Sequence, residues 1–470
     1  MLTITPPCLL LTLALVSGVP SLTQAQADPT AAHRQLARGI LEQLIAINTT
    51  DSAGNTPQAA QAMAARLLAA GFPTSDVTVL GPDQRLGNLV ARFRGRGSGK
   101  RPILLMAHLD VVEARREDWS VDPFTFLEQD GYFYGRGSAD NKAGVAILVA
   151  NFIRYHQEGF VPDRDLILLL TADEETTGAS IEWLLRSHRD LVDADYALNT
   201  DAGDPILKGG RRVMFVVQAS EKVYLSFRLE VTDNGGHSSR PTKENAIYRL
   251  AQGLVRLAAF EFPVTLNEVT RAFFERSAAI DTGQVARDMH AIAGTPPDPA
   301  AATRLAASPY YNAMMRTTCV ATRLDGGHAD NALPQAARAV VNCRILPGES
   351  PAEVERTLRR VLADERIAVT PIGSAVASPP SPLRPDVMQA IGRLVAAQFP
   401  GVPVVPEMAT GASDGLFTRN AGIPTYGVSA LFQDPDDVRW HARDERISVE
   451  VFYDALEFWY RMVKTLAGAR

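Results

Sequence analysis

The sequence predicts an α/β fold, in which a domain with a mostly parallel sheet is interrupted by an inserted ferredoxin-like α+β module. Two continuous apolar runs, 103–107 and 166–171, have the composition of strands buried on both faces, and helical stretches separate them. Between 219 and 373 the order becomes β-α-β-β-α-β, which is typical of a ferredoxin-like module. Helix–strand alternation returns over 374–470, so an insertion explains the chain better than two consecutive domains do.

The opening part of the chain carries the pattern of the first domain. A helical period places Leu36, Ile40 and Leu44 on one face of a helix at 33–47. The other expected elements are helices at 58–70, 142–155 and 180–185 and strands at 86–93, 103–107 and 166–171. Strands that alternate with helices in this way favour parallel pairing.

The inserted module is expected to form a sheet of its own. Its strands are predicted at 223–231, 317–323, 337–346 and 367–372, and its helices at 245–260 and 351–362. A long stretch at 261–311, rich in Ala and Pro, separates the first helix from the second strand. The resulting organisation is a first part of the α/β domain at 28–218, the module at 219–373 and a second part at 374–470.

Composition limits the classes of protein that this chain can belong to. With 470 residues, of which 46% are hydrophobic and 21% charged, two folded units are expected. The formal net charge is −6 and no Lys/Arg-rich run occurs, which argues against nucleic acid as a partner.

The N-terminus has the features of a secretory signal over residues 1–27. An apolar run at 9–19 is too short to span a membrane, and Ala25-Gln26-Ala27 supplies a cleavage site of small residues. Residues 1–7 carry no Lys or Arg, which departs from the usual pattern. We expect a secreted or periplasmic protein that keeps no membrane span once the signal is removed.

Two cysteines, Cys319 and Cys343, remain in the mature chain and lie in strand-like runs on either side of a turn at 326–333. They could face each other across a hairpin and form a disulfide in an exported protein. Two buried free thiols are the alternative.

Potential metal ligands occur where the predicted buried strands end. His108 and Asp110 follow the run at 103–107, and side chains two apart share a face of a strand. At the carboxyl end of a parallel strand both point into the crevice where α/β sheets bind ligands. Imidazole binds zinc, and a nearby carboxylate orients it. Taken alone, His108-Leu109-Asp110 is explained equally well as a turn in which Asp110 caps a helix.

Further carboxylates occur in two motifs. Asp140 lies in a Gly-rich turn that enters a helix, where it could be an N-cap or could bridge two cations. Asp173, Glu174 and Glu175 follow the strand at 166–171. Adjacent acids at a strand end are unfavourable without a positive charge nearby, although a solvated acidic turn is the alternative. Asp201 comes after the apolar pair 197–198, and His441 lies late in the chain.

Together these motifs resemble the M20 metallopeptidase family, over about residues 35 to 465. The shared pattern is HxD at His108, GRGxxDxK at Asp140, DEE at Glu175, then a late Asp and a late His. The resemblance implies two divalent metal ions, with zinc expected and cobalt or manganese as alternatives. It implies a cis peptide between Asp140 and Asn141.

The resemblance also implies a role for each ligand. His108, Asp201 and a bridging Asp140 would hold one metal ion, and Glu175 and His441 the other, with the same Asp140. Asp110 would orient His108, and Glu174 would be the general base.

The resemblance makes the inserted module a lid and dimerisation domain. His237, in Gly235-Gly236-His237, would stabilise the oxyanion, from its own or a partner subunit of a homodimer. Asn331 and Arg344 would bind the substrate carboxylate, and Gly411 would line the substrate cleft. The alternatives are that His237 is an ordinary loop histidine and that Arg344 pairs with an acidic residue of the lid.

The implied activity is metal-dependent cleavage of an amide bond in a small peptide by a carboxypeptidase or dipeptidase. An N-acyl-amino-acid deacylase on the same site is the alternative. A serine hydrolase with Ser413 in Gly411-Ala412-Ser413-Asp414-Gly415 is another, but Pro406 is expected to separate the strand at 402–405 from that motif. A non-catalytic binding protein would have lost a ligand or the base, and none is lost here.

Overall fold

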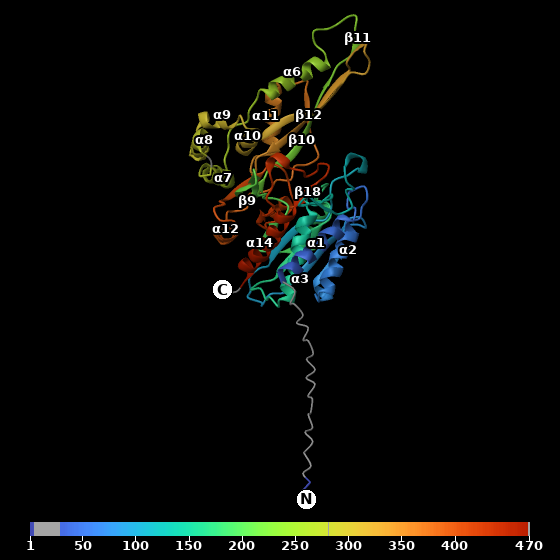
Figure 1. Cartoon of the computed structure of the whole chain (residues 1–470). Coiled ribbons are helices and arrows are strands. Elements are labelled where there is room, and N and C mark those ends of the chain that lie inside the picture. The colour runs from blue at the N-terminus through green and yellow to red at the C-terminus, as the bar shows by residue number, and fades with distance from the viewer. Residues whose placement is uncertain (4–28, 281, 469–470) are drawn as a thin grey trace.

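The computed structural model describes residues 1–3, 29–280 and 282–468 (Figure 1). The signal segment expected at 1–27 lies, from residue 4 on, outside the described residues. No helix in the described ranges is both long and apolar enough to cross a membrane.

A large mixed sheet forms the centre of the main body, with strand order β1-β2-β6-β3-β7-β17-β9-β16. Its middle strands, β6, β3, β7 and β17, run parallel, while β1, β2 and the β17–β9 contact are antiparallel. The bounds are β1 Val77–Leu80, β2 Asn88–Phe93, β3 Ile103–His108, β6 Leu166–Thr171, β7 Tyr196–Asn199, β9 Arg211–Glu221, β16 Val404–Ala409 and β17 Thr425–Gly427. β8 (Ile206–Lys208) pairs with β9. The parallel centre agrees with the α/β class read from the sequence.

Both faces of the central strands are covered. Leu105 of β3 belongs to an apolar cluster with helices α1, α3 and α14, while Leu104 and Met106 face a second cluster with α4. This explains why these strands are continuous apolar runs rather than alternating ones. The helices around the sheet are α1 Pro29–Ile45, α2 Thr56–Ala69, α3 Lys142–Gln157, α4 Ala179–Ser187, α5 Arg189–Val192, α12 Pro385–Gln398, α13 Gly415–Asn420 and α14 Val449–Ala467.

A small three-stranded sheet lies beside the main one. It has the order β18-β5-β4, with β4 Leu127–Gln129, β5 Tyr132–Tyr134 and β18 Arg446–Ser448. β18 leads directly into α14, so this sheet joins the segment before α3 to the C-terminal segment.

The second lobe in Figure 1 is an antiparallel sheet with order β12-β14-β10-β15, covered on one face by α6 and α11. In chain order it reads β10-α6-β12-β14-α11-β15, and the two central strands are the first and third, as in a ferredoxin-like module. The bounds are β10 Val223–Thr232, α6 Ala246–Ala258, β12 Thr318–Gly326, β14 Ala336–Ile345, α11 Pro351–Leu362 and β15 Ala368–Ile372. A short ribbon of β11 (Gly236–His237) and β13 (Ala332–Leu333) extends from its end.

The two mature cysteines lie in this module. Cys319 of β12 and Cys343 of β14 are directly opposite in the antiparallel register and form a disulfide. Of the two possibilities left open by the sequence, the structure has the paired one.

The stretch at 261–311, which carried no assignment from the sequence, contains helices and extends toward the main body. Its helices are α7 Glu268–Ala278, α8 Gly283–Ala293, α9 Pro299–Leu305 and α10 Pro309–Met315. α7 packs on β16 of the large sheet, and Arg276 donates to the carbonyl of Val404 at 3.1 Å. The stretch at 261–311 therefore contacts the large sheet of the main body as well as continuing the chain of the module.

Candidate active site

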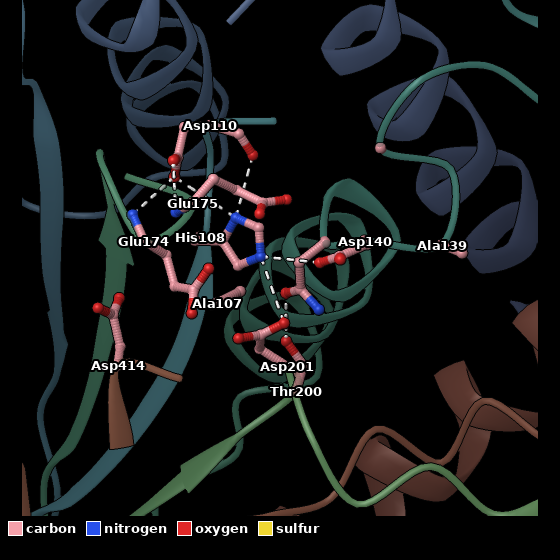
Figure 2. Close-up of polar contacts among 12 residues, drawn as sticks. Ala107, His108, Asp110, Ala139, Asp140, Glu174, Glu175, Thr200, Asp201 and Asp414 are labelled. Atoms are coloured by element: carbon pink, nitrogen blue, oxygen red, sulfur yellow. Dashed lines mark hydrogen bonds and ion pairs between the residues drawn. The ribbon is translucent and has the colours of Figure 1, made fainter. Parts of the chain in front are cut away.

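Three parallel strands deliver the polar side chains of the site from their carboxyl ends. His108 is the last residue of β3, Glu174 and Glu175 follow β6, and Asp201 follows β7 (Figure 2). Because β6, β3 and β7 are neighbours, these side chains converge on one edge of the sheet. Asp140 joins them from the turn before α3, and its peptide bond to Asn141 is cis, as the family resemblance implies.

The carboxylate of Asp140 lies between two histidines. Its Oδ1 is 3.0 Å from Nε2 of His108, and its Oδ2 is 3.2 Å from Nε2 of His441. His108 Nε2 also lies 3.3 Å from Asp201 Oδ1, and His441 Nε2 lies 3.0 Å from Glu175 Oε2. The result is two groups of three ligand atoms, each group within 4.8 Å, that share Asp140.

The chemistry of this donor set fits two divalent cations. Imidazole nitrogen and carboxylate oxygen without thiolate suit zinc, cobalt or manganese. The cluster is also strongly negative. Hydrogen bonds to Asp140 and Glu175 raise the pKa of His441 to about 10. Burial, together with the charge of Asp201, raises the pKa of Glu174 well above its ordinary value. Positive charge placed between these groups relieves that repulsion.

Asp110 connects the two halves of the site. Its Oδ1 accepts from the backbone N–H of Glu174 at 3.1 Å and its Oδ2 from that of Glu175 at 2.9 Å. The same carboxylate lies 3.4 Å from Nδ1 of His108. The side chain is 6% exposed, so its position is fixed. The Asp110 carboxylate therefore fixes the turn that carries Glu174 and Glu175, and it also faces the imidazole of His108.

A residue that the sequence reasoning did not assign, Glu445, positions the Asp140 turn. It is fully buried, and its carboxylate accepts the backbone N–H groups of Gly137 at 3.1 Å, Ala139 at 2.8 Å and Asp140 at 3.0 Å. Arg136 pairs with it at 2.7 Å. Glu445 lies four residues after His441, so an acid shortly after a ligand histidine was the available signal.

The predicted oxyanion histidine and two predicted carboxylate-binding residues lie away from this cluster. His237 is exposed on β11, where its Nδ1 is 2.8 Å from Ser239 Oγ, and the backbone carbonyl of Asn331 accepts from Ser238 N at 3.0 Å. β11 is at the far tip of the module in Figure 1. Arg344 stacks over Tyr224 on the sheet face opposite α6 and α11, with its guanidinium 4.8 Å from the ring centroid. Within the described chain, none of the three lines the pocket beside the cluster.

The pocket beside the cluster has a volume of about 770 Å³. Gly411 lines it, together with Asp140, Glu174, Glu175, Asp201 and His441. Its other walls are largely apolar and include Ile206, Leu431, Val438 and Trp440. A substrate with an apolar group fits beside the cluster.

Ser413 lies in the pocket wall but has no histidine partner among the described residues. Its hydroxyl donates to Glu221 at 3.1 Å and accepts from Gly415 N at 3.2 Å. Glu221 itself is fully buried and paired with Arg419. The expectation that Pro406 ends the strand is wrong, because β16 continues through it to Ala409. β16 is the edge of its sheet, where proline is tolerated. The contacts of Ser413, not the proline, argue against a serine nucleophile.

The fold and the cluster together define a metallopeptidase or amidohydrolase, and the comparisons agree. The chain belongs to peptidase family M20/M25/M40, whose family model matches residues 104–465. Human N-fatty-acyl-amino acid synthase/hydrolase PM20D1 is 29% identical over 388 residues, covering 79% of this chain and 75% of that protein. Carboxypeptidase S of Saccharomyces cerevisiae is 29% identical over 290 residues, covering 57% of this chain and 49% of that protein.

Solved structures show the same fold. The M20 family metallo-carboxypeptidase Sso-CP2 of Sulfolobus solfataricus superposes with a TM-score of 0.66 at 17% identity, covering 92% of this chain and 99% of that one. YXEP of Bacillus subtilis, described as a dinuclear metal binding peptidase, has a TM-score of 0.59 at 12% identity, covering 93% and 99%.

Proposed function

We propose that this protein is a two-metal amide hydrolase that cleaves small peptide-like substrates with a free carboxylate, as a carboxypeptidase or dipeptidase. The observation that carries the proposal is Asp140, whose two oxygens face His108 at 3.0 Å and His441 at 3.2 Å. A carboxylate shared by two ligand groups is the arrangement that a two-metal site requires. His108, Asp140 and Asp201 would hold one ion, and Asp140, Glu175 and His441 the other.

In the proposed reaction, the metal ions and the side chains of the protein would have separate roles. Bound divalent cations would supply Lewis acidity, which acidifies water and polarises the scissile carbonyl. Glu174 takes a proton from the attacking water and returns it to the leaving amine. Its raised pKa, caused by burial and by Asp201, suits a group that both accepts and donates a proton. Asp110 fixes the backbone of Glu174, so the base is held in place.

A second candidate is an N-acyl-amino-acid deacylase on the same site. The apolar wall formed by Ile206, Leu431, Val438 and Trp440 supports it, because an acyl chain fits there as well as a side chain does. The similarity to an N-fatty-acyl-amino acid synthase/hydrolase points the same way.

We further propose a homodimer through the module at 219–373, with the flanking parts at 28–218 and 374–470 forming the catalytic domain. β12 is an edge strand, and Val320 and Leu324 on it are 61% and 70% exposed. A second copy or lid closure would bring His237, Asn331 and Arg344 to the substrate. In that position His237 would stabilise the oxyanion, and Asn331 and Arg344 would bind the carboxylate.

We also propose export, to a secreted or periplasmic location, with removal of residues 1–27. The disulfide between Cys319 and Cys343 supports it, because disulfides persist in oxidising compartments.

The test of the central proposal is Glu174→Gln in the metal-loaded enzyme, assayed on dipeptides and N-acyl amino acids. We expect kcat to fall by about three orders of magnitude while metal content stays unchanged. Activity at the level of the unaltered enzyme would contradict the role of Glu174. The substrate panel decides between peptidase and deacylase.

A further inference from the structure

The metal pocket contains a second pair of carboxylates that the proposed reaction does not use. Asp204 lies three residues beyond Asp201, and Glu407 lies on β16, and both line the pocket. Glu407 accepts a hydrogen bond from the hydroxyl of Tyr310, which α10 places in the same wall. Within the described part of the chain, no Arg or Lys side chain lines this pocket. The pair is therefore without a cationic partner there.

The two acids are half-buried, and Glu407 is close enough for its charge to act on Asp204. Burial raises the pKa of Asp204 to about 7, and the charge of Glu407 adds to that rise, against a hydrogen bond from Ser429. Burial also raises the pKa of Glu407, although the hydrogen bond from Tyr310 opposes it. A cation between them would favour both ionised forms.

A second, independent feature of the pocket indicates that its ligand carries a hydrogen-bond donor. Gln218 lines the pocket and is 1% exposed. Its Nε2 donates to Glu221 at 3.1 Å, while its Oε1 has no hydrogen-bond partner among the residues that the structure describes. A buried acceptor without a partner is costly, so a ligand that donates there is favoured. Aromatic rings of Tyr310 and Trp440 line the same pocket, and such rings attract cations.

We propose that Asp204, Glu407 and Gln218 form a subsite for the ammonium group of the substrate, on the acyl side of the scissile amide. The inference rests on the proposed hydrolase function and names its substrate class: peptides or aminoacyl compounds with a free amine. The apolar walls hold the carbon chain, and the acidic pair binds the charged end of it. An N-acyl amino acid without an amine leaves the two carboxylates without a cationic partner and Gln218 Oε1 without a donor, and a site built this way rejects such an analogue.

The test uses matched compounds that differ only in the amine. Alanyl-phenylalanine is compared with propanoyl-phenylalanine, and aminohexanoyl-phenylalanine with hexanoyl-phenylalanine, so that the two pairs distinguish an α-amine from a remote one. Binding is measured by calorimetry on the metal-loaded Glu174→Gln variant, and hydrolysis is measured on the otherwise unaltered enzyme. Asp204→Asn and Glu407→Gln are added singly, with Glu182→Gln on the exposed face of α4 as a matched control. Thermal unfolding of each variant verifies its fold.

We expect the amine compound of at least one pair to bind and react roughly 10- to 100-fold better than its partner. Asp204→Asn and Glu407→Gln should remove most of that preference and leave the amine-free compound nearly unchanged, while Glu182→Gln has no effect. Equal binding of both members of both pairs, or a preference that survives both substitutions, would overturn the subsite. A third metal ion per chain that Glu407→Gln abolishes would also overturn it, because an inorganic cation would then be the occupant. If the amine compounds bind better but no compound is hydrolysed, the proposed hydrolase function would be contradicted while the amine subsite would stand.

Discussion

Replacing Asp110 by Asn removes one charge and one acceptor from the group that connects the two halves of the metal site. In the protein, its two oxygens accept the backbone N–H groups of Glu174 and Glu175 at 3.1 and 2.9 Å, and Oδ1 also lies 3.4 Å from Nδ1 of His108. An amide in the same place accepts only one of the two bonds and turns an N–H toward the other donor. A lost hydrogen bond to a charged group costs about 2 kcal/mol.

That cost corresponds to a loss of metal affinity of about 30-fold, within the range found for groups that orient metal ligands. The assay is a zinc titration of the metal-free protein with a competing chelator, run with kcat/KM for a dipeptide. Asp173→Asn is the matched control. Asp173 is also buried and accepts two backbone N–H groups, from Ala179 at 2.8 Å and Ser180 at 3.0 Å, but it caps α4 rather than holding a ligand. Both variants should lose stability, and only Asp110→Asn should lose metal. Equal metal affinity in Asp110→Asn and the unaltered protein would refute the reasoning.

Three further predictions concern the rest of the chain. Ser413→Ala should lose about 1 kcal/mol of stability with its bond to Glu221 and keep its kcat; inactivation by a serine-directed reagent would contradict this. Burial, with the charge of Arg154, lowers the pKa of His33 from 6.5 to about 4, so stability is complete above pH 6.5 and falls toward pH 4. Urea unfolding at pH 7.5 and pH 5 should show about 2 kcal/mol lost to this group, and His33→Gln should lose that part of the difference. Replacing both Cys319 and Cys343 by Ala opens a bond that spans 24 residues and should cost about 3 kcal/mol, read from denaturant midpoints; an unchanged midpoint would mean that the bond does not constrain the unfolded chain.

Local sequence patterns predicted the framework of the site well. The run at 166–171 is β6, and 351–362 is α11, with the bounds expected from the sequence. His108 and Asp110 could be placed at a strand end because strand periodicity and the apolar run define where β3 stops. Glu175, Asp201 and His441 come from separate segments, and only the family resemblance brought them together in advance.

What the sequence did not reveal depends on long-range packing. The 261–311 stretch has no clear helical period, because its helices are short and pack on different partners, including β16. The Tyr310–Glu407 contact joins residues 97 apart and has no local signal. Glu445 was visible next to His441, but its role needed the backbone of the Asp140 turn. The edge position of β16, which tolerates Pro406, follows from sheet order alone.

The central claim, that His108, Asp140, Glu175, Asp201 and His441 hold two metal ions that the activity needs, is tested most directly by elemental analysis of the purified protein. The same sample is assayed on dipeptides and N-acyl amino acids before and after chelation. The account predicts two divalent ions per chain, loss of hydrolysis on chelation and recovery when metal is returned. A protein without bound metal that hydrolyses its substrate equally well in the presence of chelator would contradict it.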